Sequence, residues 1–361
     1  MPKRMLALPF GKDDLGSDRL NFLRKYQSLL GELGWCVGIE AKGPTLEGWA
    51  EDCFREIKLM GGRFVWHLPN AAAKQLHAGV SDELKRMADE ASRFKSLGLE
   101  AVTIHCAPAA SFDPPEDAGF ERYNSPMSAE EMLAHITAQV GPLMELNRLT
   151  GGILNIETVD VTNFRGGGYR VPTYLQLQTG CREDLLWLKR QTGVGITFDS
   201  EHFLCAGNLL ERKADFEELP VDEPGPNDRI PPAVAELAKT AGYWLRKGSP
   251  PTSVASMSLA DFVEHAKPRL FHFGAADRAI DEEGRIATHL PYDLSQPKQK
   301  QLLDWQIRYI TRHRGVIGAV IEVTGQLKPE MYSPWSPRPD DDEEAKKKTY
   351  LTVIEEIEAL Q

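Results

Sequence analysis

The sequence predicts an α/β protein, a single (β/α)₈ TIM barrel. Eight apolar runs of strand length recur along the 361 residues, and helical segments alternate with them. Several runs end in a histidine or a carboxylic acid, which is expected where the carboxyl ends of barrel strands converge on one mouth. The predicted strands cover residues 5–10, 35–40, 63–69, 101–105, 152–157, 195–199, 269–274 and 316–323.

Amphipathic segments between these runs predict the outer helices. Ser128 with Glu131 forms a capping-box pattern before a helix that reaches residue 149. Further helices are predicted from residue 18 onward and at residues 46–60, 81–97, 258–266, 298–311 and 340–360. A triple glycine within residues 164–170 predicts a flexible loop that carries Arg165 and Arg170.

Residues 206–257 interrupt the alternation of strands and helices. They are rich in proline and acidic residues and contain one predicted helix, at residues 233–246. This segment is too short for a core of its own, so we predict that it is a loop insertion after the sixth strand. The whole chain, residues 1–361, is then predicted to be one domain. Loops that follow barrel strands form the active-site face, so the insertion is expected to border the mouth.

Composition limits the class of protein. Hydrophobic residues make up 42% of the chain, and 42 basic against 53 acidic residues give a formal net charge of −11. This balance disfavours a general polyanion binder, although a local basic groove remains compatible with it. Five cysteines without a CxxC pair favour a reduced, cytoplasmic protein. Neither a signal peptide nor a membrane span is predicted, and the sequence indicates no oligomeric state.

Six ionisable residues at predicted strand ends form the candidate site. They are His67, His105, Glu157, Asp199, His272 and Glu322. Each has an ordinary structural alternative, such as a helix cap, a salt bridge or a buried hydrogen bond. Together in one mouth, however, they would cost desolvation and repulsion unless bound cations neutralised them. Glu40 also ends a strand, and its role stays open between a cap and a substrate contact.

The mixture of imidazoles and carboxylates predicts one or two divalent ions, Zn²⁺ or Mn²⁺ rather than Ca²⁺. One ion would be held by a quartet comprising Glu157, Asp199, His272 and Glu322. A second would lie between His67 and His105, with Glu157 bridging the two ions.

These residues carry a resemblance to a known group of proteins. The most specific element is Phe198-Asp199-Ser200-Glu201-His202-Phe203, and it lies in the matching order with Asn155-Ile156-Glu157, Phe271-His272-Phe273 and Ile321-Glu322. Apart from the insertion, nearly the whole chain resembles the xylose isomerase-like superfamily, which includes sugar isomerases, sugar epimerases and endonuclease IV.

The resemblance implies roles for individual residues. The quartet matches the metal ligands shared across the superfamily, and His67 and His105 match extra ligands of the endonuclease-like branch. His202 and His289 match the positions that hold a third ion in that branch. The chain departs from the branch here, because Ala287 stands where an Asp is usual and Leu290 begins a stretch that lacks the usual Gly-Glu-Gly. A complete third site is therefore not expected.

The sequence favours one function and leaves several alternatives open. The favoured one is a metal-dependent isomerase or epimerase of a sugar or sugar phosphate, with Glu157 and Glu322 as the proton-transfer pair. His202 is assigned to catalysis and substrate binding, and the resemblance assigns Arg278 to substrate binding. The alternative is a phosphodiesterase that cleaves abasic DNA, which His67 and His105 favour and the acidic composition disfavours. Metal-dependent lyase or hydrolase chemistry and a binding role complete the alternatives.

Overall fold

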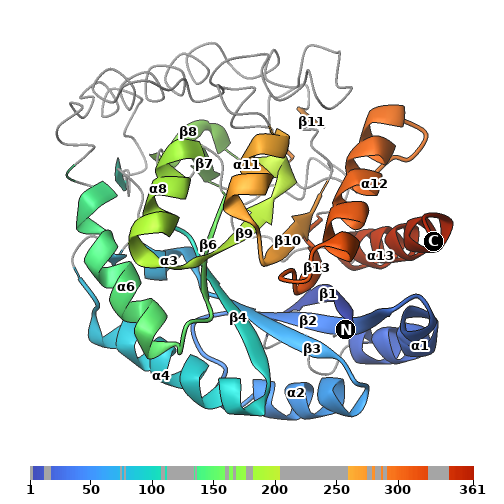
Figure 1. Cartoon of the computed structure of the whole chain (residues 1–361), viewed down its shortest axis with the longest axis horizontal. Helices are drawn as coiled ribbons and strands as arrows, with labels where there is room; N and C mark the ends of the chain where they lie inside the picture. The colour runs from blue at the N-terminus through green and yellow to red at the C-terminus, as the bar shows by residue number, and fades with distance from the viewer. Residues whose placement is uncertain are drawn as a thin grey trace.

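Eight parallel strands close into a barrel with helices around it in a computed structural model of the chain (Figure 1). Neighbouring strands follow the order β1-β13-β10-β9-β6-β4-β3-β2, and pairing of β2 with β1 closes the circle. The strands are β1 (Arg4–Phe10), β2 (Trp35–Lys42), β3 (Arg63–His67), β4 (Leu99–Ile104), β6 (Leu154–Glu157), β9 (Gly195–Asp199), β10 (Leu270–Phe273) and β13 (Gly318–Ile321). The predicted TIM barrel is thus confirmed, with each of its strands in the predicted place.

The structure describes most of the chain, with gaps. The described residues are 3–11, 18–73, 75–76, 79–106, 110–111, 134, 136–158, 162–165, 168–175, 182–203, 259–274, 279–280, 286–287, 291–323 and 341–361. The predicted insertion at 206–257 lies outside these residues and stays a prediction. Within the described part, no helix is both long and apolar enough to cross a membrane.

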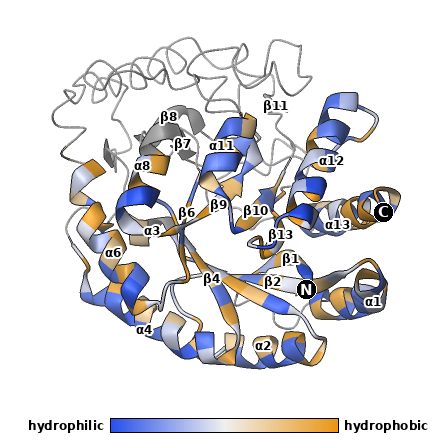
Figure 2. Cartoon of the chain, viewed as in Figure 1, coloured by the Kyte–Doolittle hydropathy of each residue, from blue (hydrophilic) through white to orange (hydrophobic). Residues whose placement is uncertain are grey.

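Helices follow the strands and cover the outside of the barrel, and hydrophilic and hydrophobic residues alternate along them (Figure 2). They are α1 (Arg19–Glu32), α2 (Ala50–Leu59), α3 (Asn70–Ala73), α4 (Asp82–Leu97), α6 (Val140–Leu149), α8 (Arg182–Thr192), α11 (Leu259–Ala266), α12 (Pro297–Arg312) and α13 (Asp341–Ala359). Local signals set their ends: Ser81 Oγ accepts the Leu84 N–H at the start of α4, and Gly98 ends it with a φ of 112°.

Side chains fill the interior of the barrel. The part nearer the amino-terminal ends of the strands is an apolar cluster made of Met5, Ala7, Cys36, Val65, Ala101, Leu270, Ile317 and Val320. Gly38 makes room for this packing, because a Cβ atom there would lie 2.1 Å from Met5 Cγ. Above the cluster, Thr103 and Thr197 share a hydrogen bond of 2.8 Å, and Asn155 donates to the Thr197 hydroxyl at 3.2 Å. This polar layer separates the apolar interior from the mouth.

Charged groups also gather at the amino-terminal end of the barrel. Arg63, at the start of β3, pairs with Glu100 on β4 and donates to the carbonyl oxygen of Lys3 at 2.8 Å. Arg4 donates to the carbonyl oxygens of Ile310 and His313 at 2.8 and 2.7 Å. We call Arg4, Arg63, Glu100 and Arg269 the basal layer, since Arg269 likewise donates to carbonyl oxygens, those of Gly152 and Glu100.

Three elements between the fifth and sixth barrel strands differ from the sequence prediction. Residues 164–170 were predicted as a flexible loop, yet β7 (Thr162–Arg165) and β8 (Gly168–Leu175) pair in an antiparallel manner, with β5 (Ala110–Ser111) alongside β8. The loop was predicted from the glycines alone, whereas the residues that flank them favour strands. Helix α8 was not predicted. A further antiparallel pair joins β11 (Ala279–Ile280) to β12 (Ile286–Ala287).

Candidate metal centre

The six predicted strand-end residues converge at the carboxyl end of the barrel. Alternation along a strand explains their direction: Asn155 and Glu157, or Thr197 and Asp199, are two residues apart and face the same side. Thr158 holds β6 against β9, because its hydroxyl accepts the Asp199 N–H at 2.7 Å. His67, His105, Glu157, Asp199 and His272 are buried, whereas the Glu322 side chain remains 21% exposed.

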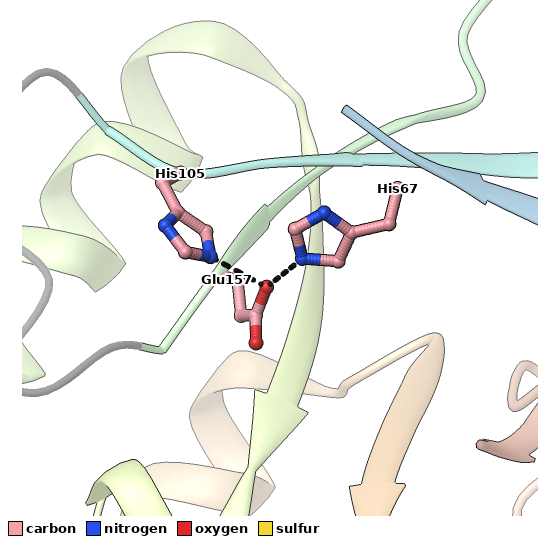
Figure 3. Close-up of side chains that lie close together, drawn as sticks. All are labelled: His67, His105 and Glu157. Atoms are coloured by element: carbon pink, nitrogen blue, oxygen red, sulfur yellow. Dashed lines mark hydrogen bonds and ion pairs between the residues drawn. The ribbon is translucent and has the colours of Figure 1, made fainter. Parts of the chain in front are cut away.

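Two histidines meet one oxygen of Glu157 (Figure 3). His67 Nε2 lies 2.8 Å from Glu157 Oε2, and His105 Nε2 lies 3.1 Å from the same atom. His67 Nδ1 lies 2.8 Å from the Leu68 carbonyl oxygen, which can only accept, so Nδ1 carries a hydrogen. In the neutral ring, Nε2 would then present a lone pair to a carboxylate oxygen. The arrangement therefore requires a proton or a cation between them.

A second group of ligand atoms shares Glu157 with the first. It consists of Glu157, Asp199, His272 and Glu322, whose ligand atoms all lie within 4.8 Å of one another. His272 Nδ1 lies 3.1 Å from Glu157 Oε1 and 2.6 Å from Glu322 Oε2. One nitrogen has at most one hydrogen to donate, so it cannot serve both carboxylates equally. A divalent cation among these atoms would satisfy both.

Two charged residues at the end of β2 complete the site. Lys42 Nζ pairs with Glu322 Oε1 and lies 3.5 Å from Glu40 Oε2. Glu40, whose side chain is 0% exposed, places Oε1 at 2.9 Å from His272 Nε2. The sequence analysis left the role of Glu40 open and did not single out Lys42. The available signal was position, since Lys42 follows Glu40 by two residues and faces the same side of the strand.

His202 lies at the edge of the site, in the helical turn of residues 200–203 that follows β9. Its backbone N–H donates to Asp199 Oδ1 at 2.9 Å, so Asp199 also acts as the cap of this turn. Its Nδ1 lies 3.6 Å from Asp199 Oδ2, 3.2 Å from the Thr158 carbonyl oxygen and 3.9 Å from Glu157 Oε1. This position is compatible with the predicted contact to substrate.

Crowding of the charges shifts several pKa values in the metal-free site. Burial raises the pKa of Asp199 to about 6, since it outweighs the opposing effect of His202. Burial opposes protonation of His202, but the Asp199 carboxylate prevails and raises the pKa to about 9. Burial opposes ionisation of Glu157, yet His272 and His105 hold its pKa well below the ordinary value.

The pKa values of the two histidines of the first group are shifted in opposite directions. Burial alone would lower the pKa of His67, but the Glu157 carboxylate raises it. For His105, burial dominates and the pKa is lowered. The buried His105 Nδ1 has no hydrogen-bond partner among the described residues. Neutral imidazole and ionised carboxylate are the forms that bind metals, so the site favours the ligand forms of His105 and Glu157.

The residues therefore fit a divalent ion. Three carboxylates and one imidazole form the larger group, and two imidazoles with a shared carboxylate form the smaller one. Mixed oxygen and nitrogen donors suit Zn²⁺ and Mn²⁺. Two other predicted site residues, Arg278 and His289, lie outside the described residues and stay predictions. Arg165 and Arg170 lie on β7 and β8, where only the backbone is described.

No protein-family model matches the sequence, and no curated protein matches it. The solved structures similar to the chain include 3-keto-D-glucoside 4-epimerase from E. coli, at 12% identity over 97% of this chain and 99% of that chain, with a TM-score of 0.48. They also include D-psicose 3-epimerase from Clostridium cellulolyticum H10, at 11% identity over 98% of each chain, with a TM-score of 0.48.

A third similar structure is a xylose isomerase-like TIM-barrel protein from Mycobacterium smegmatis in complex with magnesium. It is 13% identical over 100% of this chain and 98% of that chain, with a TM-score of 0.44. The names of these three proteins describe two sugar epimerases and a xylose isomerase-like barrel. At these identities the likeness concerns the fold alone.

Proposed function

We propose that the protein is a divalent-metal-dependent isomerase or epimerase of a sugar or sugar phosphate. The observation that supports this proposal most strongly is the placement of Glu157 and Glu322. They come from strands separated by β9 and β10, and both approach His272 Nδ1, at 3.1 and 2.6 Å. Two carboxylates on two sides of one point are the arrangement that proton removal and return next to a carbonyl needs.

The residues divide the chemistry between them. A bound divalent ion would supply Lewis-acid polarisation of substrate oxygens and charge stabilisation. Glu322 faces the mouth and can take or return a proton on the substrate, whereas Glu157, 1% exposed, lies deeper and serves from the other side. Lys42, paired with Glu322, can donate a hydrogen bond to a substrate oxygen. His202 borders the same space.

Isotope exchange tests the proposal. The protein, loaded with Zn²⁺ or Mn²⁺, is incubated in deuterated water with a panel of ketoses and aldoses. Deuterium should enter the carbon next to the carbonyl, and Glu322→Gln should lower the rate by about 10²–10⁴ through loss of the proton acceptor. Glu100→Gln in the basal layer is the matched control and should retain exchange.

A second candidate function has its own observation. The group of His67, His105 and Glu157 adjoins the quartet through Glu157, and two ions that share a carboxylate suit in-line displacement at phosphorus. We therefore keep a phosphodiesterase of abasic DNA as the alternative. If no sugar exchanges deuterium while abasic DNA is nicked in a metal-dependent way, the alternative replaces the isomerase or epimerase.

A further inference from the structure

Four charged residues at the mouth form a closed ring of contacts. Lys42 Nζ pairs with Glu322 Oε1, and Glu322 Oε2 lies 2.6 Å from His272 Nδ1. On the other side of the imidazole, His272 Nε2 lies 2.9 Å from Glu40 Oε1. Glu40 Oε2 returns to Lys42 Nζ at 3.5 Å. Each carboxylate thus uses one oxygen for the lysine and the other for the histidine.

The contact with Glu40 determines which nitrogen of His272 carries hydrogen. An ionised carboxylate only accepts hydrogen bonds, so His272 Nε2 must donate to Glu40. The ammonium group of Lys42 lies 3.5 Å from the other oxygen of Glu40, so a cation faces this carboxylate on its second side. In the neutral ring, the lone pair then lies on Nδ1, the atom that faces Glu157 and Glu322.

Glu40 itself lies outside the group of gathered ligand atoms. The quartet of Glu157, Asp199, His272 and Glu322 has its donor atoms within 4.8 Å of one another, and Glu40 is not part of it. Its contact with His272 is on the nitrogen that points away from the quartet. A carboxylate that holds the distal nitrogen of a metal-bound histidine fixes the orientation of the ring and raises its basicity.

We propose that Glu40 is a positioning residue of the metal centre, which holds His272 as the Nε2–H tautomer so that Nδ1 binds the ion. The inference rests on the proposed function in one respect, the binding of a divalent ion by the quartet. Lys42 has a supporting role, since it provides the countercharge for Glu40 and ties the same carboxylate to Glu322. Loss of such a partner typically weakens metal binding by about 10–100-fold.

Zn²⁺ affinity of the full chain, measured by competition with a chelator, tests this role. Glu40→Gln keeps a hydrogen-bond acceptor but removes the charge, and it should weaken Zn²⁺ binding by about 10-fold. Glu40→Leu removes both and should weaken binding by about 100-fold. Glu90→Gln is the matched control, because Glu90 is another buried glutamate. Its partners, Thr45 and the Leu46 N–H, are not among the four residues that contact one another at the mouth. It should leave affinity unchanged.

The proton NMR signal of the His272 Nε2–H group distinguishes a positioning role of Glu40 from a role in the stability of the fold alone. In the Zn²⁺-loaded protein the His272 Nε2–H proton should resist exchange with solvent, because Glu40 accepts it within a buried site. The signal should persist in Glu40→Gln and disappear in Glu40→Leu. Should Glu40→Leu fail to fold, Glu40→Asp provides the same test, since it keeps the charge but withdraws the carboxylate by one methylene and should lose both the signal and part of the affinity.

The outcomes distinguish the inference from the function on which it rests. If Glu157→Gln loses Zn²⁺ while the Glu40 variants bind it as tightly as the unmodified protein, the role of Glu40 is wrong and the quartet stands. If Glu157→Gln binds Zn²⁺ as tightly as the unmodified protein, the quartet itself is wrong and both proposals fall.

Discussion

The two ends of the barrel both carry charged groups, but the chain satisfies these charges differently at each end. In the basal layer, Arg63 pairs with Glu100, and Arg4 and Arg269 donate to backbone carbonyl oxygens. At the mouth, four carboxylates gather around a few imidazoles and one ammonium group. Burial there raises the pKa of Asp199 to about 6. The chain alone therefore does not fully stabilise the ionised form of this carboxylate.

This difference separates structural charge from functional charge. A charged residue that the chain fully satisfies contributes to the fold and needs nothing further. A cluster that is incomplete without a cation costs stability, and such a cost persists in proteins where a ligand or a reaction makes use of it. We therefore expect changes at the mouth to alter metal binding strongly and changes in the basal layer to alter stability only.

The largest effect is expected for Glu157→Gln, because Glu157 belongs to both groups of ligand atoms. The variant should lose nearly all bound divalent ion after dialysis against Zn²⁺, as measured by elemental analysis of the purified protein. Retention of the unmodified metal content would show that Glu157 is not the shared ligand.

A smaller effect is expected for His105→Ala, which removes a ligand of the first group only. The variant should lose one ion and keep the one that the quartet holds, whereas His272→Ala should lose the quartet ion. Titration with Zn²⁺ gives the stoichiometry of each variant. Equal losses in the two variants would indicate a single ion spread over both groups.

The pH dependence of stability offers a third comparison. Burial opposes protonation of His202, but Asp199 raises its pKa to about 9 in the metal-free protein, from 6.5. Protonated His202 therefore stabilises the fold fully below about pH 6.5, and this contribution is lost as pH rises through about 9.

In the presence of a chelator, the free energy of unfolding should fall by about 1–3 kcal/mol between pH 6.5 and 9.5. Urea denaturation at several pH values measures this change, and His202→Gln should show a smaller fall. An identical pH profile in the variant would remove His202 as the cause.

The smallest effect belongs to the basal layer. Arg63→Met leaves Glu100 without its main partner and should lower the free energy of unfolding by about 1–2 kcal/mol. Because Arg63 lies at the opposite end of the barrel, the affinity for Zn²⁺ should not change. Denaturant titration and chelator competition on the same protein check both statements, and a loss of metal affinity would contradict the proposed separation of the two ends.

The sequence predicted the barrel well because each strand is a buried apolar run with a polar end. Such runs are local signals, and burial on both faces makes them nearly continuous. Helix α8 was not predicted, although Leu185 and Leu188 are three residues apart and both are buried, which is the spacing of one helix face. The pairing of β7 with β8 depends on partners that local sequence does not specify.

The candidate site was predicted in part for a related reason. Strand ends are visible in sequence, so the convergence of His67, His105, Glu157 and His272 followed from the fold. The role of Glu40 and the presence of Lys42 did not, because the predicted strand ended at Glu40 whereas β2 continues to Lys42. The hydrogen bond between Glu40 and His272 joins strands that are not neighbours in the barrel, and only the closed structure reveals it.

The most direct test compares the unmodified protein with Asp199→Asn at pH 8, by thermal unfolding with a chelator and then with Zn²⁺. Asp199 is ionised at this pH although burial raises its pKa to about 6. In chelator, the neutral amide avoids the cost of the buried charge but loses the attraction to protonated His202, so the melting temperature should change little. Added Zn²⁺ should raise the melting temperature of the unmodified protein and leave that of the variant unchanged. A destabilised variant together with an unmodified protein that ignores Zn²⁺ would contradict the claim that the mouth is built to be completed by a cation.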